Sequence, residues 1–191
     1  MRIRSLCVYC GSAAHPDHRE AAADLGRQIA ARGIRLVTGG GDIGLMGVVA
    51  NATLQAGGHV TGVIPRFLTA REVHHKALTE TELVDSMHER KQRMFDLVDA
   101  FVVLPGGFGT LDETIEVMTW RQLDLHDKPI LLLDLGGYWR PFLDLVAHVI
   151  AAGYARPAAA TLVAAVPTPD ALFATLDALP EPATRGSGER L

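Results

Sequence analysis

Short apolar runs alternate with longer amphipathic segments along the chain. The apolar runs are typical of β-strands, and the unbroken run at 100–104 suits a strand buried on both faces of a parallel sheet. The longer segments follow a helical period, and several end at glycine. The pattern predicts strands at 3–10, 34–38, 59–64, 100–104, 129–133 and 161–166, and one that ends at Leu83-Val84. It predicts helices at 15–32, 45–55, 87–98, 110–125, 138–152 and 169–179, and a loop or short helix at 66–78.

This alternation predicts an α/β fold, a Rossmann-like doubly wound parallel sheet with helices on both faces. No linker or internal repeat interrupts it, so we expect a single domain over 1–180 and a flexible C-terminal tail over 181–191. Ligands of such sheets bind beyond the carboxyl ends of the strands. The candidate loops are therefore those that follow the first, second, fourth and fifth predicted strands.

Glycine is concentrated in two of these loops. Gly11-Ser12 follows the first strand, where backbone N–H groups and a hydroxyl suit an anion, although a plain tight turn explains the same residues. The second loop contains Gly39, Gly40, Gly41 and Gly44. It matches G-x-G-x-x-G formally, but it follows the second strand and lacks the ribose-binding acid, so a phosphate-cradling loop is predicted rather than a dinucleotide site.

The loop after the 100–104 strand is the most informative. It contains Gly106, Gly107, Gly109 and Thr110, and a helix predicted to begin at Thr110 would turn free N–H groups toward a phosphate. Glu113 follows one turn later. Thr110-x-x-Glu113 is also a capping-box pattern, so cap and catalyst are equal interpretations of Glu113 at this point. A helix N-terminus lowers the pKa of a carboxyl group, so we expect Glu113 to be ionised at neutral pH.

The 87–98 helix begins with a second capping-box pattern, Ser86-x-x-Glu89, which makes Glu89 structural. Arg90 and Lys91 follow in the first turns, where positive charge opposes the helix dipole. This placement favours a bound phosphate or carboxylate near one of them. Two solvated charges on an amphipathic helix are the alternative.

Composition narrows the function classes. The formal net charge of −4 argues against nucleic acid and against an anionic membrane surface as partners. The N-terminus lacks the features of a secretory signal, so a cytoplasmic protein is expected. Cys7 and Cys10 lie three apart in a strand and are predicted to point to opposite faces as buried thiols. No metal site is expected, and His74-His75 is predicted to lie in an exposed loop.

The residues from Pro105 to Glu113 resemble the PGGxGTxxE motif of the LOG (Lonely guy) family, whose members are cytokinin riboside 5'-monophosphate phosphoribohydrolases. The similarity extends through four further segments: Met87-His88-Glu89-Arg90-Lys91, Gly39-Gly40-Gly41 with Gly44-Leu45-Met46-Gly47, Thr119-Trp120 to Pro129, and Tyr9-Cys10-Gly11-Ser12. It covers nearly everything from Ser5 to about Gly153. Ala13 departs from the family, which often has Ser or Thr there.

The resemblance implies a nucleotide-binding domain, a homodimer with higher assembly left open, and no metal or organic cofactor. It implies hydrolysis of the N-glycosidic bond of AMP or N6-prenyl-AMP to free base and ribose 5-phosphate. It places catalysis on Arg90 and Glu113. For Glu113, the resemblance therefore favours the catalytic interpretation over the helix cap. It places nucleotide contacts on the following residues: Glu80, Met87, Lys91, Gly107, Gly109 and Thr110.

Three other functions remain open from the sequence. A lysine decarboxylase, a label attached to this motif, needs pyridoxal phosphate on a lysine, and lysine occurs only at Lys76, Lys91 and Lys128. A molybdenum-cofactor-carrier-like binder would use similar phosphate loops without turnover. A general nucleoside 5'-monophosphate nucleosidase shares the chemistry and differs in the base; Met87 and Trp120 are candidates for the base pocket.

Overall fold

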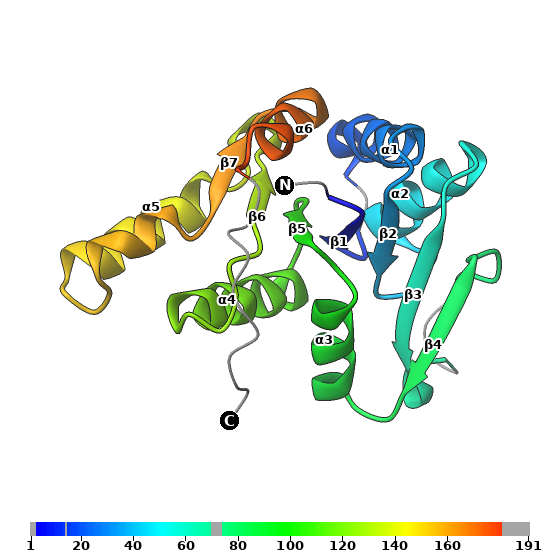
Figure 1. Ribbon diagram of the computed structural model, residues 1–191, viewed down its shortest axis with the longest axis horizontal. Helices are drawn as coiled ribbons and strands as arrows, with labels where there is room; N and C mark the ends of the chain where they lie inside the picture. Colours follow the sequence, from blue (N-terminus) through cyan, green and yellow to red (C-terminus); the bar gives the residue numbers. More distant parts are fainter. Residues whose placement is uncertain (1–2, 14, 70–73, 181–191) are drawn as a thin grey trace.

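The computed structural model describes residues 3–13, 15–69 and 74–180. In this part of the chain seven strands form one parallel sheet in the order β4-β3-β2-β1-β5-β6-β7 (Figure 1). The strands are β1 (Ser5–Tyr9), β2 (Arg35–Thr38), β3 (Val60–Pro65), β4 (Glu80–Val84), β5 (Ala100–Val103), β6 (Ile130–Leu133) and β7 (Ala164–Val166). The predicted α/β fold is confirmed, and the tail at 181–191 lies outside the described residues.

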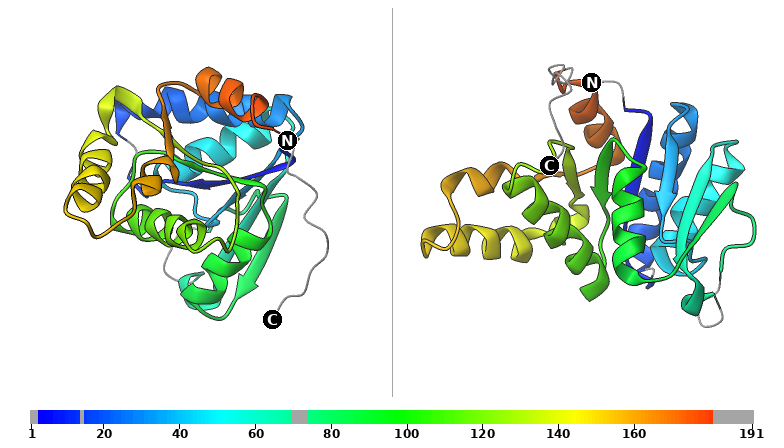
Figure 2. Two further views of the ribbon diagram at one scale, coloured as in Figure 1. Left: turned by 60° about the vertical axis from the view of Figure 1, so that its left-hand side comes forward. Right: turned by 60° about the horizontal axis from the view of Figure 1, so that its bottom comes forward.

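Helices cover both faces of the sheet (Figure 2). One face is covered by α1 (Pro16–Ala31), α2 (Gly44–Gln55) and α6 (Pro169–Asp177), and the other by α3 (Met87–Asp96) and α4 (Phe108–Gln122), with α5 (Arg140–Ala151) beside them. Two changes of detail appear. The predicted strand at 161–166 shortens to β7 because 157–161 forms a 3₁₀ turn, and the 66–78 segment contains a 3₁₀ turn at Arg66–Leu68.

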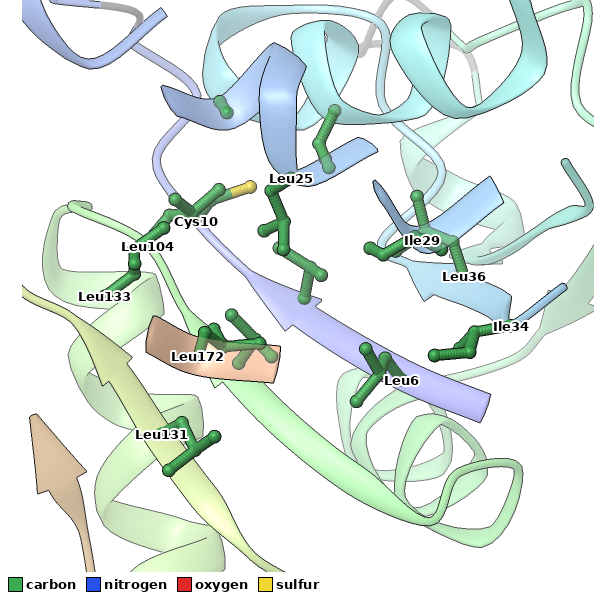
Figure 3. Packing of buried hydrophobic residues seen from close by; sticks show 14 of the residues in the cluster. Leu6, Cys10, Leu25, Ile29, Ile34, Leu36, Leu104, Leu131, Leu133 and Leu172 are labelled. Atoms are coloured by element: carbon green, nitrogen blue, oxygen red, sulfur yellow. The ribbon is translucent and has the colours of Figure 1, made fainter. Parts of the chain in front are cut away.

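The alternation of side chains along β1 explains the two cores. Leu6 and Cys10 point into the core beneath α1, α2 and α6 (Figure 3), whereas Cys7 and Tyr9 point into the core beneath α3 and α4. Both cysteines are buried and free, as their spacing predicts. None of the helices in the described ranges has the length and apolar character needed to cross a membrane.

The sheet order reverses between β1 and β5, because β2 lies on one side of β1 and β5 lies on the other. The loops that leave these two strands therefore separate toward opposite faces and leave a crevice at their carboxyl ends. This is the edge at which the glycine-rich loops are found.

Candidate active site

The three glycine-rich loops meet at the carboxyl edge of the sheet. Gly11 donates its N–H to the carbonyl of Pro105 at 3.1 Å, which ties the loop after β1 to the loop after β5. Gly44 has φ +66°, and its Cα packs directly against the backbone of Ser12, so no side chain fits there. Three segments distant in sequence thus form one continuous backbone surface.

Arg90 reaches this surface from the first turn of α3. Its side chain is buried, and Nε donates to the Val63 carbonyl at 3.2 Å. The guanidinium group packs so tightly against Gly39 that a Cβ at Gly39 would overlap it. The glycine loop after β2 therefore accommodates an arginine side chain beneath it.

Glu113 faces Arg90 from α4. Oε1 of Glu113 lies 3.7 Å from Nη1 of Arg90, and the two side chains are only 12% and 10% exposed. Burial raises the pKa of Glu113 to about 7, although the neighbouring Arg90 charge opposes this shift. The prediction that Glu113 is ionised at neutral pH is therefore wrong, since burial outweighs the charges of Arg90 and Lys91 that lower this pKa.

The helix that carries Glu113 begins earlier than predicted. Phe108 is its first residue, Gly107 is the N-cap and makes no side-chain cap bond, and Thr110 is buried inside the first turn. The Thr110-x-x-Glu113 capping box is therefore not formed. Two consequences follow: no side chain caps the first-turn N–H groups of α4, and the Glu113 carboxylate is turned toward Arg90.

At α3 the Ser86 half of the capping box is formed, whereas Glu89 bonds one residue before the N-cap. The Ser86 hydroxyl accepts from the Glu89 N–H at 3.1 Å, and the Glu89 carboxylate accepts from the Asp85 N–H at 2.7 Å. This cap satisfies backbone donors at the start of α3, one turn before Arg90. Glu89 is structural, as predicted.

Lys91 is paired with protein carboxylates on both sides of Glu113. Its Nζ lies 3.1 Å from Asp112 and 3.1 Å from Glu116, both on α4. Burial alone lowers the pKa of the Lys91 amine, but the bonds and charges of Glu116 and Asp112 outweigh burial and leave that pKa above its usual value. The sequence favoured a bound anion near Arg90 or Lys91. For Lys91, the carboxylates of Asp112 and Glu116 on α4 are that anion.

Two predicted contact residues differ in their placement. Met87 is the first residue of α3 and is 38% exposed at the same edge as Arg90. Glu80 begins β4, at the opposite end of the strand from that edge, and accepts a hydrogen bond from Thr61 at 3.2 Å. The structure therefore separates Glu80 from the other candidates. Trp120 packs edge-on against Phe95, between α4 and α3.

His75 is a residue that the sequence reasoning misplaced. It is buried rather than exposed. Its ring Nε2 lies 3.1 Å from Asn51 Oδ1, and its backbone N–H donates to the Gly40 carbonyl at 3.1 Å. His75 thus braces the glycine loop from the connection between β3 and β4, and no local pattern signals this contact. Among the described residues no group of three or more His, Cys, Asp or Glu is arranged to hold a metal.

The lysines do not fit a pyridoxal-phosphate site. A Schiff base forms on an unprotonated amine, whereas Lys91 is held as a cation by two carboxylates. Lys128 lies at the start of β6, away from the carboxyl edge, where Nζ donates to the Phe95 carbonyl at 2.6 Å and lies 3.9 Å from the Phe95 ring centre. Lys76 is exposed beside the buried His75.

The parallel sheet with glycine loops at its switch point defines a Rossmann-like protein, and a solved structure supports this class. The molybdenum cofactor binding protein of Rippkaea orientalis superposes with a TM-score of 0.68 over 93% of this chain and 97% of that chain. At 23% identity, this likeness shows the fold alone.

Sequence comparison identifies the family. Residues 46–176 match the family model described as "Possible lysine decarboxylase". The cytokinin riboside 5'-monophosphate phosphoribohydrolase LOG of Oryza sativa subsp. japonica is 44% identical over 92% of this chain and 74% of its own length. LOG3 of Arabidopsis thaliana, with the same enzyme name, is 42% identical over 92% of this chain and 83% of its own length. The chain belongs to this LOG family of phosphoribohydrolases.

Proposed function

We propose that the chain hydrolyses the N-glycosidic bond of AMP or an N6-prenylated AMP. Water is consumed, and the free base and ribose 5-phosphate are released. The observation that carries this proposal is the buried Arg90–Glu113 pair, 3.7 Å apart, beside an uncapped helix N-terminus. The names of the relatives support the substrate class.

The 5'-phosphate binds at the start of α4 in this proposal. The first-turn N–H groups at Phe108, Gly109 and Thr110 have no side-chain cap, and the helix dipole favours an anion there. Gly107 and Gly109 have open space where a Cβ would stand, so a ligand can approach their backbone closely. The loops at Gly11-Ser12 and Gly39–Gly41 complete the cradle.

Glu113 acts on the sugar. Departure of the base leaves positive charge on the ribosyl carbon and ring oxygen, and an ionised carboxylate stabilises that charge. The same carboxylate takes a proton from the attacking water. With a pKa of about 7, Glu113 is divided between its two protonation states near neutrality, so it can accept the proton of the attacking water and return it to the departing base.

Arg90 positions the nucleotide. Its guanidinium is fixed by Val63 and Gly39, so little conformational freedom is lost when a phosphate or sugar oxygen binds to it. Lys91 holds α3 against α4 through Asp112 and Glu116, which fixes the separation of Arg90 and Glu113.

The test is a product assay on AMP and on isopentenyladenosine monophosphate, with chromatography of base and ribose 5-phosphate. Release of base by the wild type that is lost in Glu113→Gln supports the proposal, and the relative rates rank the prenylated substrate against AMP. Glu20→Gln on α1 is the matched control, because Glu20 is 84% exposed and pairs with Arg27 away from the site. Tight nucleotide binding without base release would favour a carrier instead.

We also propose a homodimer. An apolar groove runs between α4 and α5, lined by Ile115, Met118, Phe142, Leu145 and Val146, among others. Ile115 and Leu145 are 48% and 53% exposed in the single chain, and Ile115 lies two residues from Glu113. A second copy would cover this surface. Sedimentation of Leu145→Asp, expected to be monomeric, against a dimeric wild type tests this.

A further inference from the structure

The phosphate loop is held from the far side by a tyrosine on a different loop. The hydroxyl of Tyr138, which follows β6, donates a hydrogen bond to the Gly106 carbonyl at 2.7 Å. The two residues are 32 positions apart in the sequence. The bond exists because β5 and β6 are neighbours in the sheet, so their carboxyl-end loops lie together.

The position of Tyr138 is set by the residues on either side of it. The 3₁₀ turn Leu135–Gly137 that leads to it contains Gly136 at φ +62° and Gly137 at φ +80°, conformations that glycine adopts readily. The next residue, Trp139, is 1% exposed, and its N–H donates to Asp134 Oδ1 at 2.7 Å. A buried tryptophan thus anchors a tyrosine that is 43% exposed.

A cavity adjoins the loop and Tyr138. Tyr138, Gly106 and Gly107 line a cavity of about 510 Å³ together with Ser12 and His18. Gly106 is packed against Thr110 and Gly11, so its Cα side is fixed, but no atom stands within 4 Å of a Cβ at Gly107. The Tyr138 hydroxyl therefore supplies a restraint on the Gly106–Gly107 peptide that packing around Gly107 does not.

The orientation of this peptide decides where the Gly107 N–H points. In a planar trans peptide the C=O and the following N–H point in opposite directions. Because Tyr138 draws the Gly106 carbonyl toward itself, the Gly107 N–H is directed away from Tyr138. Within the described part of the chain this N–H has no hydrogen-bond acceptor. It is a free donor beside the start of α4.

We propose that Tyr138 is a positioning residue that makes the site selective for 5'-phosphorylated ligands. It holds the Gly106–Gly107 peptide so that the Gly107 N–H joins the first-turn N–H groups of α4 in binding the phosphate. This inference rests on the proposed function for the identity of the ligand. It adds a residue outside the resembling motif and outside the Arg90–Glu113 pair.

The test is Tyr138→Phe, which removes the hydroxyl and keeps the ring contacts with His18 and Trp139. We expect roughly a threefold to tenfold rise in KM for AMP, the range that the loss of one hydrogen bond covers, with a smaller change in kcat. Inhibition by ribose 5-phosphate weakens by the same factor, whereas inhibition by adenosine, which has no phosphate, is unchanged. Tyr154→Phe is the matched control, since Tyr154 is 87% exposed beyond α5.

Two results with Tyr138→Phe overturn the inference. One is a wild-type KM and a wild-type ribose 5-phosphate inhibition constant in Tyr138→Phe. The other is equal weakening by adenosine and ribose 5-phosphate, which indicates general deformation of the site. If the wild type releases no base, the proposed function fails, and calorimetry of AMP and adenosine binding still tests Tyr138. Absence of AMP binding to the wild type overturns both.

Discussion

The guanidinium group of Arg90 occupies the space that a side chain at Gly39 would need. Gly39 follows β2 and Arg90 belongs to α3, so this contact joins the glycine loop after β2 to helix α3 at the carboxyl edge of the sheet. The glycine is required here by close approach rather than by backbone angle. Its absence of a side chain lets a buried cation reach Glu113.

Gly39→Ala is therefore expected to displace Arg90 or the loop. A shift of about 1 Å in a catalytic group costs on the order of 100-fold in rate, and we expect a loss of kcat/KM of that order. The control is Gly57→Ala after α2, where φ +77° strains the backbone but no atom would meet the new Cβ. Gly57→Ala should lose stability and keep its activity. Full activity in Gly39→Ala would show that Arg90 tolerates displacement.

Activity should depend on pH through Glu113. We expect kcat/KM to rise with pH and to level off above a pKa of about 7, because the ionised carboxylate stabilises the ribosyl cation. Arg90 lowers the pKa of Glu113, so removing its charge in Arg90→Gln should move the rising limb to higher pH, besides weakening turnover. A profile recorded from about pH 5 to about pH 9 checks both. A limb that moves to lower pH in Arg90→Gln would contradict the assignment.

Lys91→Met should destabilise the protein. It leaves Glu116, which is 25% exposed, without its cation, and the joint between α3 and α4 is lost. We expect a loss of about 1–3 kcal/mol, below the cost of a fully buried pair because Asp112 is 63% exposed and remains solvated. Urea unfolding measures it. Lys128→Met, at the opposite edge of the sheet, is the comparison: it also removes a lysine, but it leaves the Lys91 contacts between α3 and α4 intact. An unchanged midpoint with weaker AMP binding would instead assign Lys91 to the nucleotide.

Ser86→Ala should affect both stability and activity. Loss of the N-cap costs about 1 kcal/mol and frays the turn that precedes Arg90, so we expect a measurable fall in kcat/KM. Thr168→Ala is the matched control, because Thr168 caps α6 with the same bond length of 3.1 Å, away from the site. The two variants should lose similar stability in thermal unfolding, while only Ser86→Ala loses activity. Equal activities would mean that Arg90 is held by Val63 and Gly39 alone.

The two capping-box patterns show how much of a helix start can be predicted from a few neighbouring residues. Ser86 caps α3 as the pattern predicts, and Glu89 turns back to the helix start, where it accepts from the Asp85 N–H. At Thr110 the same pattern fails, since the glycines before it let the helix begin at Phe108 and Thr110 packs against Gly106. A pattern of four residues does not show at which residue a helix begins, because contacts with a neighbouring loop can place the expected capping side chain inside the helix.

The sequence by itself determined the parallel α/β sheet, the glycine loops, the cap of α3 and the opposite faces of Cys7 and Cys10. These depend on periodicities and backbone preferences within a few residues. Only the tertiary structure decided that Glu113 has a raised pKa, that Lys91 is paired by α4, that Glu80 lies at the opposite end of its strand, and that His75 and Tyr138 brace the loops. Burial and contacts between distant segments arise when the strands assemble, and no local pattern encodes them.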